Sequence, residues 1–331
     1  MKFDKKDLKI LEILDSNARE RISSIAKKCL ISRQVAMYRI NKLLSQKSIY
    51  GFYTLIDVGK LGYSSFRLHI RLKESNEKKY REFARNIFSN YPCFWVGFVS
   101  GYFDIIIDIF ARNQNDFEEI FSKMLKENKN VIASYEILPI VKMDLYGYNY
   151  FSASKYRTWC RTLHINTGEY RLSKSDTIIL KEIKFNARYE YIKIAKKLGM
   201  ARVTVKNRIK ELEKKGIIAG YKIFINFSHF NRNSYKIFIK YDTSRIEERV
   251  ELMGYLKGMP GVLATLEFIG RWDLDIEIHM ENAKELQKFL INLRNKFSII
   301  RDYEIVQILE DYGIDFFPEP IWQNFLTPAN K

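Results

Sequence analysis

The chain has 331 residues, which is long for one domain, so we expect two to four domains. Hydrophobic residues make up 47% and charged residues 29%, a balance that is typical of globular proteins and argues against an intrinsically disordered chain. The first residues are charged and no stretch of about 18 apolar residues occurs. We therefore expect a cytoplasmic protein that does not bind a membrane.

The three cysteines give no sign of a covalent or metal framework. Cys29, Cys93 and Cys160 are odd in number and lie far apart, without a C-x-x-C pair. This pattern fits neither a set of disulfides nor a zinc site. We expect a reducing compartment, and we expect neither a metal nor a cofactor.

The positive charge is concentrated in two segments. The net charge is +17, and residues 1–60 hold 13 basic against 6 acidic residues, while residues 170–225 hold 15 against 5. The rest of the chain is balanced, with 28 residues of each sign. Two separate basic segments are typical of surfaces that bind the phosphate backbone of a nucleic acid.

An internal repeat relates these two segments at an offset of 169 residues. Gly101 and Asp104 also recur, as Gly270 and Asp273, so the repeat extends beyond the basic segments. The residues of the first basic segment that recur at this offset are Asp7, Ile10, Leu11, Asn17, Ala18, Arg19, Ile25, Ala26, Lys27, Lys28, Arg33, Arg39, Ile40, Leu43, Ile49 and Gly51.

Residues 1–60 predict three helices and a β wing. Apolar residues at spacings of three and four begin with Leu8 and Leu11, and a short second helix follows around Ile25. Ser32 is a good N-cap for a third helix over 32–45, which we expect to bury Val35, Ile40 and Leu43. Residues 172–228 predict the same unit, with Gly199 in the turn where the first copy has Leu30, and with Ala201 as a poor N-cap.

The spacing of apolar residues changes over residues 64–142 and 232–312, where each copy predicts the order β-α-β-β-α-β. The expected strands cover 66–72, 94–100, 104–110 and 133–141 in the first copy, and 235–241, 262–269, 273–280 and 302–309 in the second. The expected helices cover 76–89, 116–127, 244–256 and 283–296. This order is the ferredoxin-like plan, so the predicted fold class is α+β with two helical units alternating with two ferredoxin-like domains.

Two segments remain outside the repeat. Residues 143–171 are rich in Tyr, Ser, Lys and Arg without a firm period, and we interpret them as a linker. Residues 313–331 contain Pro318, Pro320 and Pro328, which predict an irregular C-terminal extension.

The repeated unit resembles the Lrp/AsnC family of transcription regulators. The resemblance covers nearly the whole chain twice, apart from the linker and the extension. It implies a winged helix-turn-helix that binds double-stranded DNA, joined to a domain that pairs through its sheet and responds to a small effector, often an amino acid. Its motif residues are Asp7, Ile10, Leu11, Asn17, Ala18, Arg19, Ile25, Ala26, Ser32, Val35, Arg39, Ile40, Leu43, Ile49, Gly101 and Asp104, and in the second copy Leu172, Ser173, Asp176, Asn186, Ala187, Arg188, Arg208, Ile209, Leu212, Gly216, Ile218, Gly220 and Tyr221.

Family members usually carry one unit per chain and assemble as dimers or larger rings. Because this chain has two units, we expect their sheets to pair within the chain as a pseudo-dimer, or between chains as a homodimer. Two different recognition helices would then read an asymmetric site.

The third helix of each unit holds the predicted DNA contacts. Arg33, Gln34, Arg202 and Lys206 are the candidates for base edges in the major groove. Arg39 and Arg208 lie beside buried positions, so we expect structural ion pairs there. The full set of candidates for the two helices is Ser32, Arg33, Gln34, Met37, Tyr38, Asn41, Arg202, Thr204, Lys206, Asn207 and Lys210, and the phosphate candidates are Lys27, Lys28, Lys196, Lys197 and Lys222.

The two glycine-aspartate turns have two interpretations. A turn of sequence Gly101-x-x-Asp104 or Gly270-x-x-Asp273 satisfies hairpin geometry without any ligand. The family resemblance instead implies effector binding at these four residues. The middle residues of the two turns differ, so the two sites need not share a ligand.

Other functions have less support from the sequence. Some chains with two Lrp-like units resemble siroheme decarboxylases of haem metabolism, in which histidine and arginine would act. The four histidines, His69, His164, His229 and His279, are not close in sequence and none recurs at the repeat offset. No nucleophile elbow, zinc-protease or phosphate-loop motif occurs, so we do not expect an enzyme. An RNA-binding or scaffolding role is also open, but a winged helix favours duplex DNA.

Overall fold

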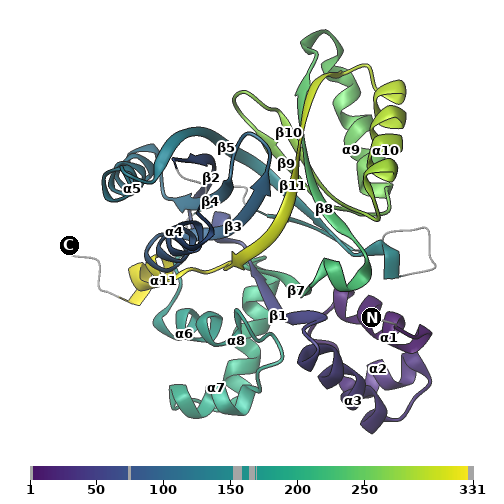
Figure 1. Ribbon diagram of the computed structural model, residues 1–331. Helices are drawn as coiled ribbons and strands as arrows, with labels where there is room; N and C mark the ends of the chain where they lie inside the picture. Colours follow the sequence, from purple (N-terminus) through teal and green to yellow (C-terminus); the bar gives the residue numbers. More distant parts are fainter. Residues whose placement is uncertain (1–2, 74–75, 152–158, 164–167, 169, 327–331) are drawn as a thin grey trace.

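The computed structural model describes residues 3–73, 76–151, 159–163, 168 and 170–326, and it shows two helical heads beneath one large curved sheet (Figure 1). The predicted α+β class is confirmed. None of the helices in these ranges combines the length and apolar character needed to cross a bilayer.

Each head is a three-helix unit followed by one strand. The first comprises α1 (Lys5–Ser16), α2 (Ile22–Cys29), α3 (Arg33–Ser45) and β1 (Ile49–Ile56), and the second α6 (Lys174–Ile183), α7 (Tyr191–Leu198), α8 (Arg202–Lys214) and β7 (Ile218–Ile225). Ser32 caps α3 by accepting a hydrogen bond from the Val35 amide at 3.2 Å, as predicted. The expected burial of Val35 is wrong: its side chain is 40% exposed, and Ala36 is the residue that faces the core.

The wings of the two heads pair with each other. β1 and β7 form an antiparallel two-stranded sheet in which Phe52 lies opposite Ile223. Each wing also reaches the other head, because the Ala18 amide donates to the Tyr221 carbonyl at 3.0 Å and the Ala187 amide donates to the Phe52 carbonyl at 2.7 Å. The repeat therefore becomes a pseudo-twofold relation between the heads.

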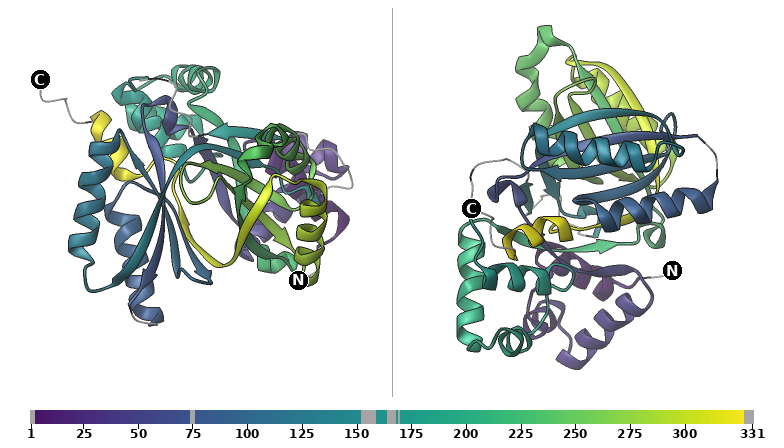
Figure 2. Two further views of the ribbon diagram at one scale, coloured as in Figure 1. Left: turned by 90° about the horizontal axis from the view of Figure 1, so that it is seen from above. Right: turned by 90° about the vertical axis from the view of Figure 1, so that its left-hand side faces the viewer.

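The remaining strands form two ferredoxin-like halves. One half consists of β2 (Ser64–Leu72), α4 (Glu77–Asn90), β3 (Cys93–Ser100), β4 (Ile105–Ala111), α5 (Gln114–Glu127) and β5 (Ile132–Tyr146). The other consists of β8 (Asn233–Tyr241), α9 (Arg249–Gly258), β9 (Val262–Phe268), β10 (Leu274–Met280), α10 (Ala283–Lys296) and β11 (Ile300–Ile314). The helices of each half cover the outer face of its own strands (Figures 1 and 2).

The two halves close into a single barrel. The strand order is β2-β4-β3-β11-β8-β10-β9-β5, and β5 pairs again with β2. The contacts of β3 with β11 and of β5 with β9 join the halves, so each half pairs with the other half of the same chain. Closure pairs the backbone N–H and C=O groups of the edge strands, which would be exposed if the two halves were separate. Of the two pairings left open by the sequence, the chain forms the internal pseudo-dimer.

The segment predicted as a linker over 143–171 contains regular structure. β5 continues to Tyr146, and β6 (Cys160–Leu163) pairs with it in antiparallel register. The expected linker therefore contributes strands to the sheet. Its residues 152–158, 164–167 and 169 lie outside the described ranges.

The C-terminal extension also differs from the prediction. It contains helix α11 (Glu319–Leu326), which packs against α6 and places the Trp322 ring 3.2 Å from the Lys181 ammonium. Pro318 and Pro320 lie at the helix start, where the missing amide hydrogen removes no helical hydrogen bond. The prolines therefore mark the beginning of a short helix. Residues 327–331 are outside the described ranges.

Candidate nucleic-acid interface

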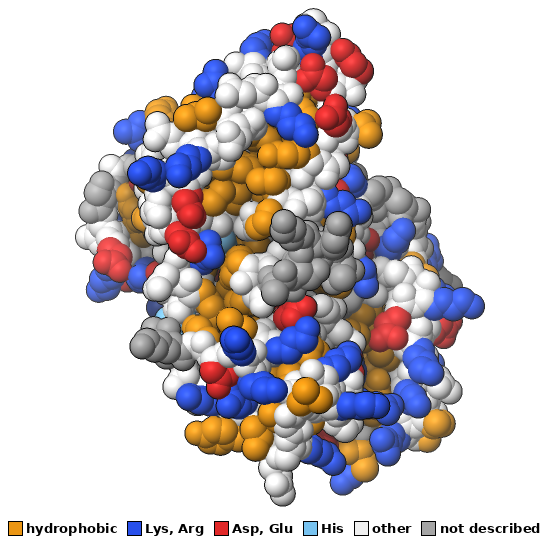
Figure 3. Space-filling model, turned by 90° about the vertical axis from the view of Figure 1, so that its right-hand side faces the viewer, with side chains coloured by type: hydrophobic (Ala, Val, Ile, Leu, Met, Phe, Trp, Pro, Cys, Tyr) orange, Lys and Arg blue, Asp and Glu red, His pale blue; other side chains and the backbone are white. Residues whose placement is uncertain are grey.

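The predicted base-reading face of α3 is open to solvent. Arg33, Gln34 and Asn41 are exposed, and Met37 and Tyr38 are 51% and 68% exposed. Two large apolar side chains on an exposed helix face are unusual for a surface that meets only water, and they suit contact with base edges and methyl groups. Lys and Arg side chains gather around this head in the lower part of Figure 3.

The corresponding face of α8 is also open, with a different chemistry. Arg202, Lys206, Asn207 and Lys210 are exposed, while Thr204 is half-buried. Among these exposed candidates, only the arginine at the first helical position is common to both helices. The two heads thus present different side chains in equivalent places.

The four lysines predicted at the ends of α2 and α7 are all exposed. Lys28 lies 3.5 Å from the Glu20 carboxylate, and Lys197 lies 2.6 Å from that of Glu182. Lys27 and Lys196 are exposed at the neighbouring positions. All four side chains are therefore accessible to a phosphate. Lys28 and Lys197 would first have to give up their surface ion pairs with Glu20 and Glu182.

The prediction that Lys222 contacts phosphate is wrong. Its side chain is buried, and its ammonium donates to Asp15 Oδ1 at 2.6 Å and to the Tyr146 carbonyl at 3.0 Å. β7 packs against β1, α1 and β6, and Lys222 reaches the end of β5 at Tyr146, so this residue of the wing points inward. Sequence alone could not separate this lysine from an exposed wing lysine.

The expected structural ion pairs of Arg39 and Arg208 are confirmed. The Arg39 guanidinium lies 2.7 Å from the carboxylates of both Asp4 and Asp7, and Arg208 lies 3.0 Å from Asp176. In each head the arginine ties the third helix to the start of the first. The Asp7 amide and the Arg39 guanidinium together lower the pKa of Asp4.

Both glycine-aspartate turns have a structural role. The Asp104 carboxylate accepts from the Leu72 amide at 2.7 Å, and the Asp273 carboxylate accepts from the Tyr241 amide at 2.8 Å. Gly101 and Gly270 have φ values of +134° and +141°, which side-chain-bearing residues rarely adopt. Each turn also lies against the last strand of the other half, because added Cβ atoms would meet Val306 and Leu138. Effector binding at these turns stays a prediction.

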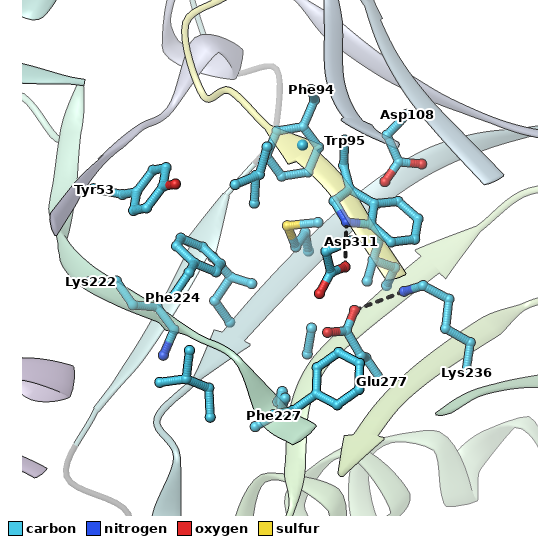
Figure 4. Close-up of a pocket in the computed structure, with 18 of the residues that line it drawn as sticks. Tyr53, Phe94, Trp95, Asp108, Lys222, Phe224, Phe227, Lys236, Glu277 and Asp311 are labelled. Atoms are coloured by element: carbon cyan, nitrogen blue, oxygen red, sulfur yellow. Dashed lines mark hydrogen bonds and ion pairs between the residues drawn. The ribbon is translucent and has the colours of Figure 1, made fainter. Parts of the chain in front are cut away.

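A feature that sequence reasoning missed is a cavity of about 320 Å³ between the wings and the barrel (Figure 4). Its charged lining includes Arg67 and Asp108 from the first half and Lys236 and Glu277 from the second. These residues occupy equivalent positions, 169 residues apart, in strands that are almost entirely buried. A repeated pair of charges inside buried strands was the signal that could have revealed the cavity.

The charges around the cavity are strongly paired. Arg67 donates twice to Asp108, at 2.7 Å each, and also to Asp275. Lys236 bridges Asp275 at 3.1 Å and Glu277 at 2.8 Å. The neighbouring carboxylates hold the pKa of Arg67 and of Lys236 above their ordinary values against the opposing effect of burial. The barrel interior therefore contains an ionic network that joins both halves.

Comparisons with known proteins agree with this architecture. A family model described as winged helix-turn-helix DNA-binding matches residues 3–46 and 172–219, the helical parts of the two heads. An uncharacterised HTH-type transcriptional regulator of Pyrococcus furiosus is 33% identical over 121 residues, which are 36% of this chain and 81% of that protein. The HTH-type transcriptional regulator LrpA of Pyrococcus horikoshii is 47% identical over 55 residues, 17% of this chain and 39% of that protein.

Among solved structures, a siroheme decarboxylase named NirDL has a similar fold over the whole length. The TM-score is 0.63 at 15% identity, over 98% of this chain and 97% of that chain. This similarity concerns the arrangement of two heads and two barrel halves, and at this identity it shows the fold alone. The sequence relatives, the matched heads and the repeated unit together establish the family: this chain belongs to the Lrp/AsnC family of helix-turn-helix transcription regulators, with two family units fused in one polypeptide.

Proposed function

We propose that this chain is a sequence-specific regulator that reads an asymmetric duplex site with two non-identical heads held at a fixed spacing. The observation that carries the proposal is the difference between the exposed faces of α3 and α8 in a pair of heads joined by their wings. At equivalent positions Met37 corresponds to Lys206, and Asn41 to Lys210. A symmetric dimer of one-unit chains has two identical faces instead.

The side chains suit direct readout of base edges. Arg33 and Arg202 lie at the first position of their helices, where an arginine reaches O6 and N7 of guanine when the helix enters the major groove. Gln34 offers an amide that pairs with adenine, and its counterpart Val203 offers only an apolar surface. Lys27 and Lys196 would contribute phosphate contacts, which add affinity and salt dependence without sequence information.

The test is a salt titration of binding to random duplex DNA and to the region upstream of the gene. The wild type is compared with the double variant Arg33→Ala/Arg202→Ala, and with the control Arg85→Ala/Arg301→Ala, which removes the same charge from exposed positions of α4 and β11. We expect steeply salt-dependent binding that prefers one sequence, and loss of that preference in the first double variant only. A wild type that ignores duplex DNA at low salt would refute the proposal.

Two finer features belong to the same proposal. A homodimer of this chain would carry four heads. Its two chains, each with two different heads, would be related by a twofold axis and would together match a palindromic DNA site. A small effector such as an amino acid would act near the glycine-aspartate turns at Gly101 and Gly270, which lie where the two barrel halves meet. Light scattering with and without DNA tests the first feature, and amino-acid titrations against DNA affinity test the second.

A second candidate is a siroheme decarboxylase type of activity, favoured by the full-length structural similarity to NirDL. The residues at the cavity give it little support. The imidazole of His279 bonds to the Tyr150 hydroxyl at 2.9 Å, and burial lowers the pKa of His279 to about 3. Asp311, which forms no ion pair among the described residues, would repel a carboxylate of such a tetrapyrrole, whereas Asp108 and Glu277 are paired with Arg67 and Lys236. Titration with iron uroporphyrin, followed by its visible absorption, distinguishes this candidate because the regulator predicts no specific complex.

A further inference from the structure

The cavity of about 320 Å³ lies where the DNA-binding heads meet the barrel. Tyr50 and Tyr53 line it from β1, and Phe224 lines it from β7. The other walls come from barrel strands, including Trp95 on β3 and Asp311 on β11. Any occupant would therefore touch both the wings and the barrel, at a place distinct from the two glycine-aspartate turns.

Aromatic rings dominate one part of the lining. Tyr53, Phe94, Trp95, Phe224 and Phe227 surround the space in Figure 4. The faces of such rings carry negative electrostatic potential, so they attract organic cations as well as apolar groups. The volume is at the small end for ligand sites and suits a molecule of about the size of an amino acid.

Asp311 is a solvent-exposed residue of β11 whose carboxylate lines this cavity. Its Oδ1 accepts a hydrogen bond from the Trp95 indole at 2.9 Å, and the carboxylate forms no ion pair with any cation of the described residues. The lining cations are already engaged, since Arg67 and Lys236 bind Asp275 and Lys222 binds Asp15.

Two acidic groups meet at this point. The Asp311 and Glu277 carboxylates point toward the same part of the cavity in Figure 4, and the charge of Glu277 acts to raise the pKa of Asp311. Glu277 has only Lys236 as its ion-pair partner among the described residues, at 2.8 Å. A cation between the two carboxylates would relieve their repulsion and complete the charge balance.

We propose that this cavity binds a small organic cation, a protonated amine with an apolar body, whose ammonium lies between Asp311 and Glu277 and whose body packs against Trp95 and the aromatic residues of the wings. The site requires only the fold described above. A consequence for regulation rests on the proposed function: because the wing strands form part of the wall, occupation of the site alters the affinity of the heads for DNA.

The experiment uses the full-length protein and three probes of similar shape and different charge. Phenethylamine is the cation, phenylethanol the neutral molecule and phenylacetate the anion, and calorimetry measures their affinities at pH 7.5. We expect phenethylamine to bind at least roughly tenfold more tightly than either of the others, since a charge-assisted hydrogen bond contributes this much.

Two variants on the same strand locate the site. Asp311→Asn keeps the shape of the side chain and removes its charge, and we expect it to lose roughly tenfold in phenethylamine affinity. Asp302→Asn makes the same chemical change at an exposed position of β11 outside the cavity, and we expect its affinity to equal that of the wild type. Equal binding of all three probes, no binding of phenethylamine, or unchanged amine affinity in Asp311→Asn would overturn the site.

DNA affinity with and without phenethylamine tests the regulatory consequence separately. A change in the wild type that is absent in Asp311→Asn supports coupling between cavity and heads, and saturating amine without any change overturns the coupling. A wild type that binds phenethylamine but never binds DNA would refute the proposed function while leaving the site intact.

Discussion

Arg19 and Arg188, equivalent residues of the two repeats, each donate hydrogen bonds to the head that contains the other. The Arg19 guanidinium donates to the Ala187 carbonyl, and the Arg188 guanidinium donates to the carbonyls of Ala18 and Glu20, both at 2.8 Å. Both residues belong to the repeated Asn-Ala-Arg motif. The motif therefore fixes the relative position of the two heads.

Removal of either arginine should weaken this pairing. We expect Arg19→Ala and Arg188→Ala each to lower the free energy of unfolding by about 1 to 3 kcal/mol, because buried carbonyls lose charged donors. Urea denaturation measures the change. Arg33→Ala serves as the control, since it removes an exposed arginine of the same head and should change stability by less than about 0.5 kcal/mol. Equal effects of all three substitutions would contradict a role in pairing.

Lys196 and Lys222 should respond in opposite ways to substitution. Lys196→Ala removes an exposed charge, so we expect weaker DNA binding, a salt slope reduced by about 1, and unchanged sequence preference. Lys222→Met removes the ammonium that lies 2.6 Å from the buried Asp15 carboxylate, so we expect a loss of roughly 3 to 5 kcal/mol in stability. DNA titrations and urea denaturation of both variants test this contrast. It fails if Lys222→Met is as stable as the wild type and binds DNA with a reduced salt slope.

The turn between α2 and α3 stores strain that its counterpart avoids. Leu30 has φ of +52° and is 85% exposed, while the equivalent Gly199 has φ of +62°. A left-handed conformation disfavours leucine by roughly 1 to 2 kcal/mol, so we expect Leu30→Gly to stabilise the protein by about 0.5 to 1 kcal/mol. Gly199→Leu should have the opposite effect. No atom lies near an added Cβ at that position, so any loss of stability comes from the left-handed backbone conformation alone. Thermal unfolding checks both signs, and stabilisation by Gly199→Leu would contradict the explanation.

The start of α8 lacks the cap that α3 has. Ala201 makes no side-chain hydrogen bond to the helix, whereas Ser32 accepts from the Val35 amide at 3.2 Å. We expect Ala201→Ser to stabilise the protein by about 0.5 to 2 kcal/mol, and Ser32→Ala to destabilise it by a similar amount. Thermal denaturation of the pair measures this. If Ala201→Ser leaves stability unchanged, the extended backbone at that position is not suited to a serine cap.

Asp311 should make stability depend on pH in a defined direction. Although Asp311 keeps an exposed surface, partial removal of its carboxylate from water and the charges of Glu277 and Glu310 raise its pKa to about 6, while the Trp95 indole and the charge of Lys236 act to lower it. The folded protein thus holds a proton that the unfolded chain releases near pH 4, so this carboxyl lowers stability as pH rises from about 4 through 6.

The comparison with Asp311→Asn isolates that effect, because the amide does not titrate. We expect the Tm of the variant minus that of the wild type to increase between pH 4 and pH 7. Asp302→Asn makes the same chemical change on the same strand outside the cavity, and its Tm difference serves as the control. A Tm difference for Asp311→Asn that is independent of pH would contradict the raised pKa.

Local patterns made much of the fold predictable. Helix periodicity, the Ser32 cap and the ion pairs of Arg39 and Arg208 depend on residues within one head, so the spacing of residues in the sequence was enough to infer them. The duplication also predicted two equivalent units. The exposure of Arg33 and Arg202 follows from the same periodicity.

The sequence by itself determined the repeated unit, the class of each element and the location of the basic surfaces, because these depend on neighbours within a few turns of chain. Only the tertiary structure decided that the barrel closes within the chain, that Lys222 points inward to Asp15, and that Asp311 faces a cavity. Each of these outcomes depends on strands or helices from opposite halves of the chain, and no local pattern reports which distant element will cover a given side chain.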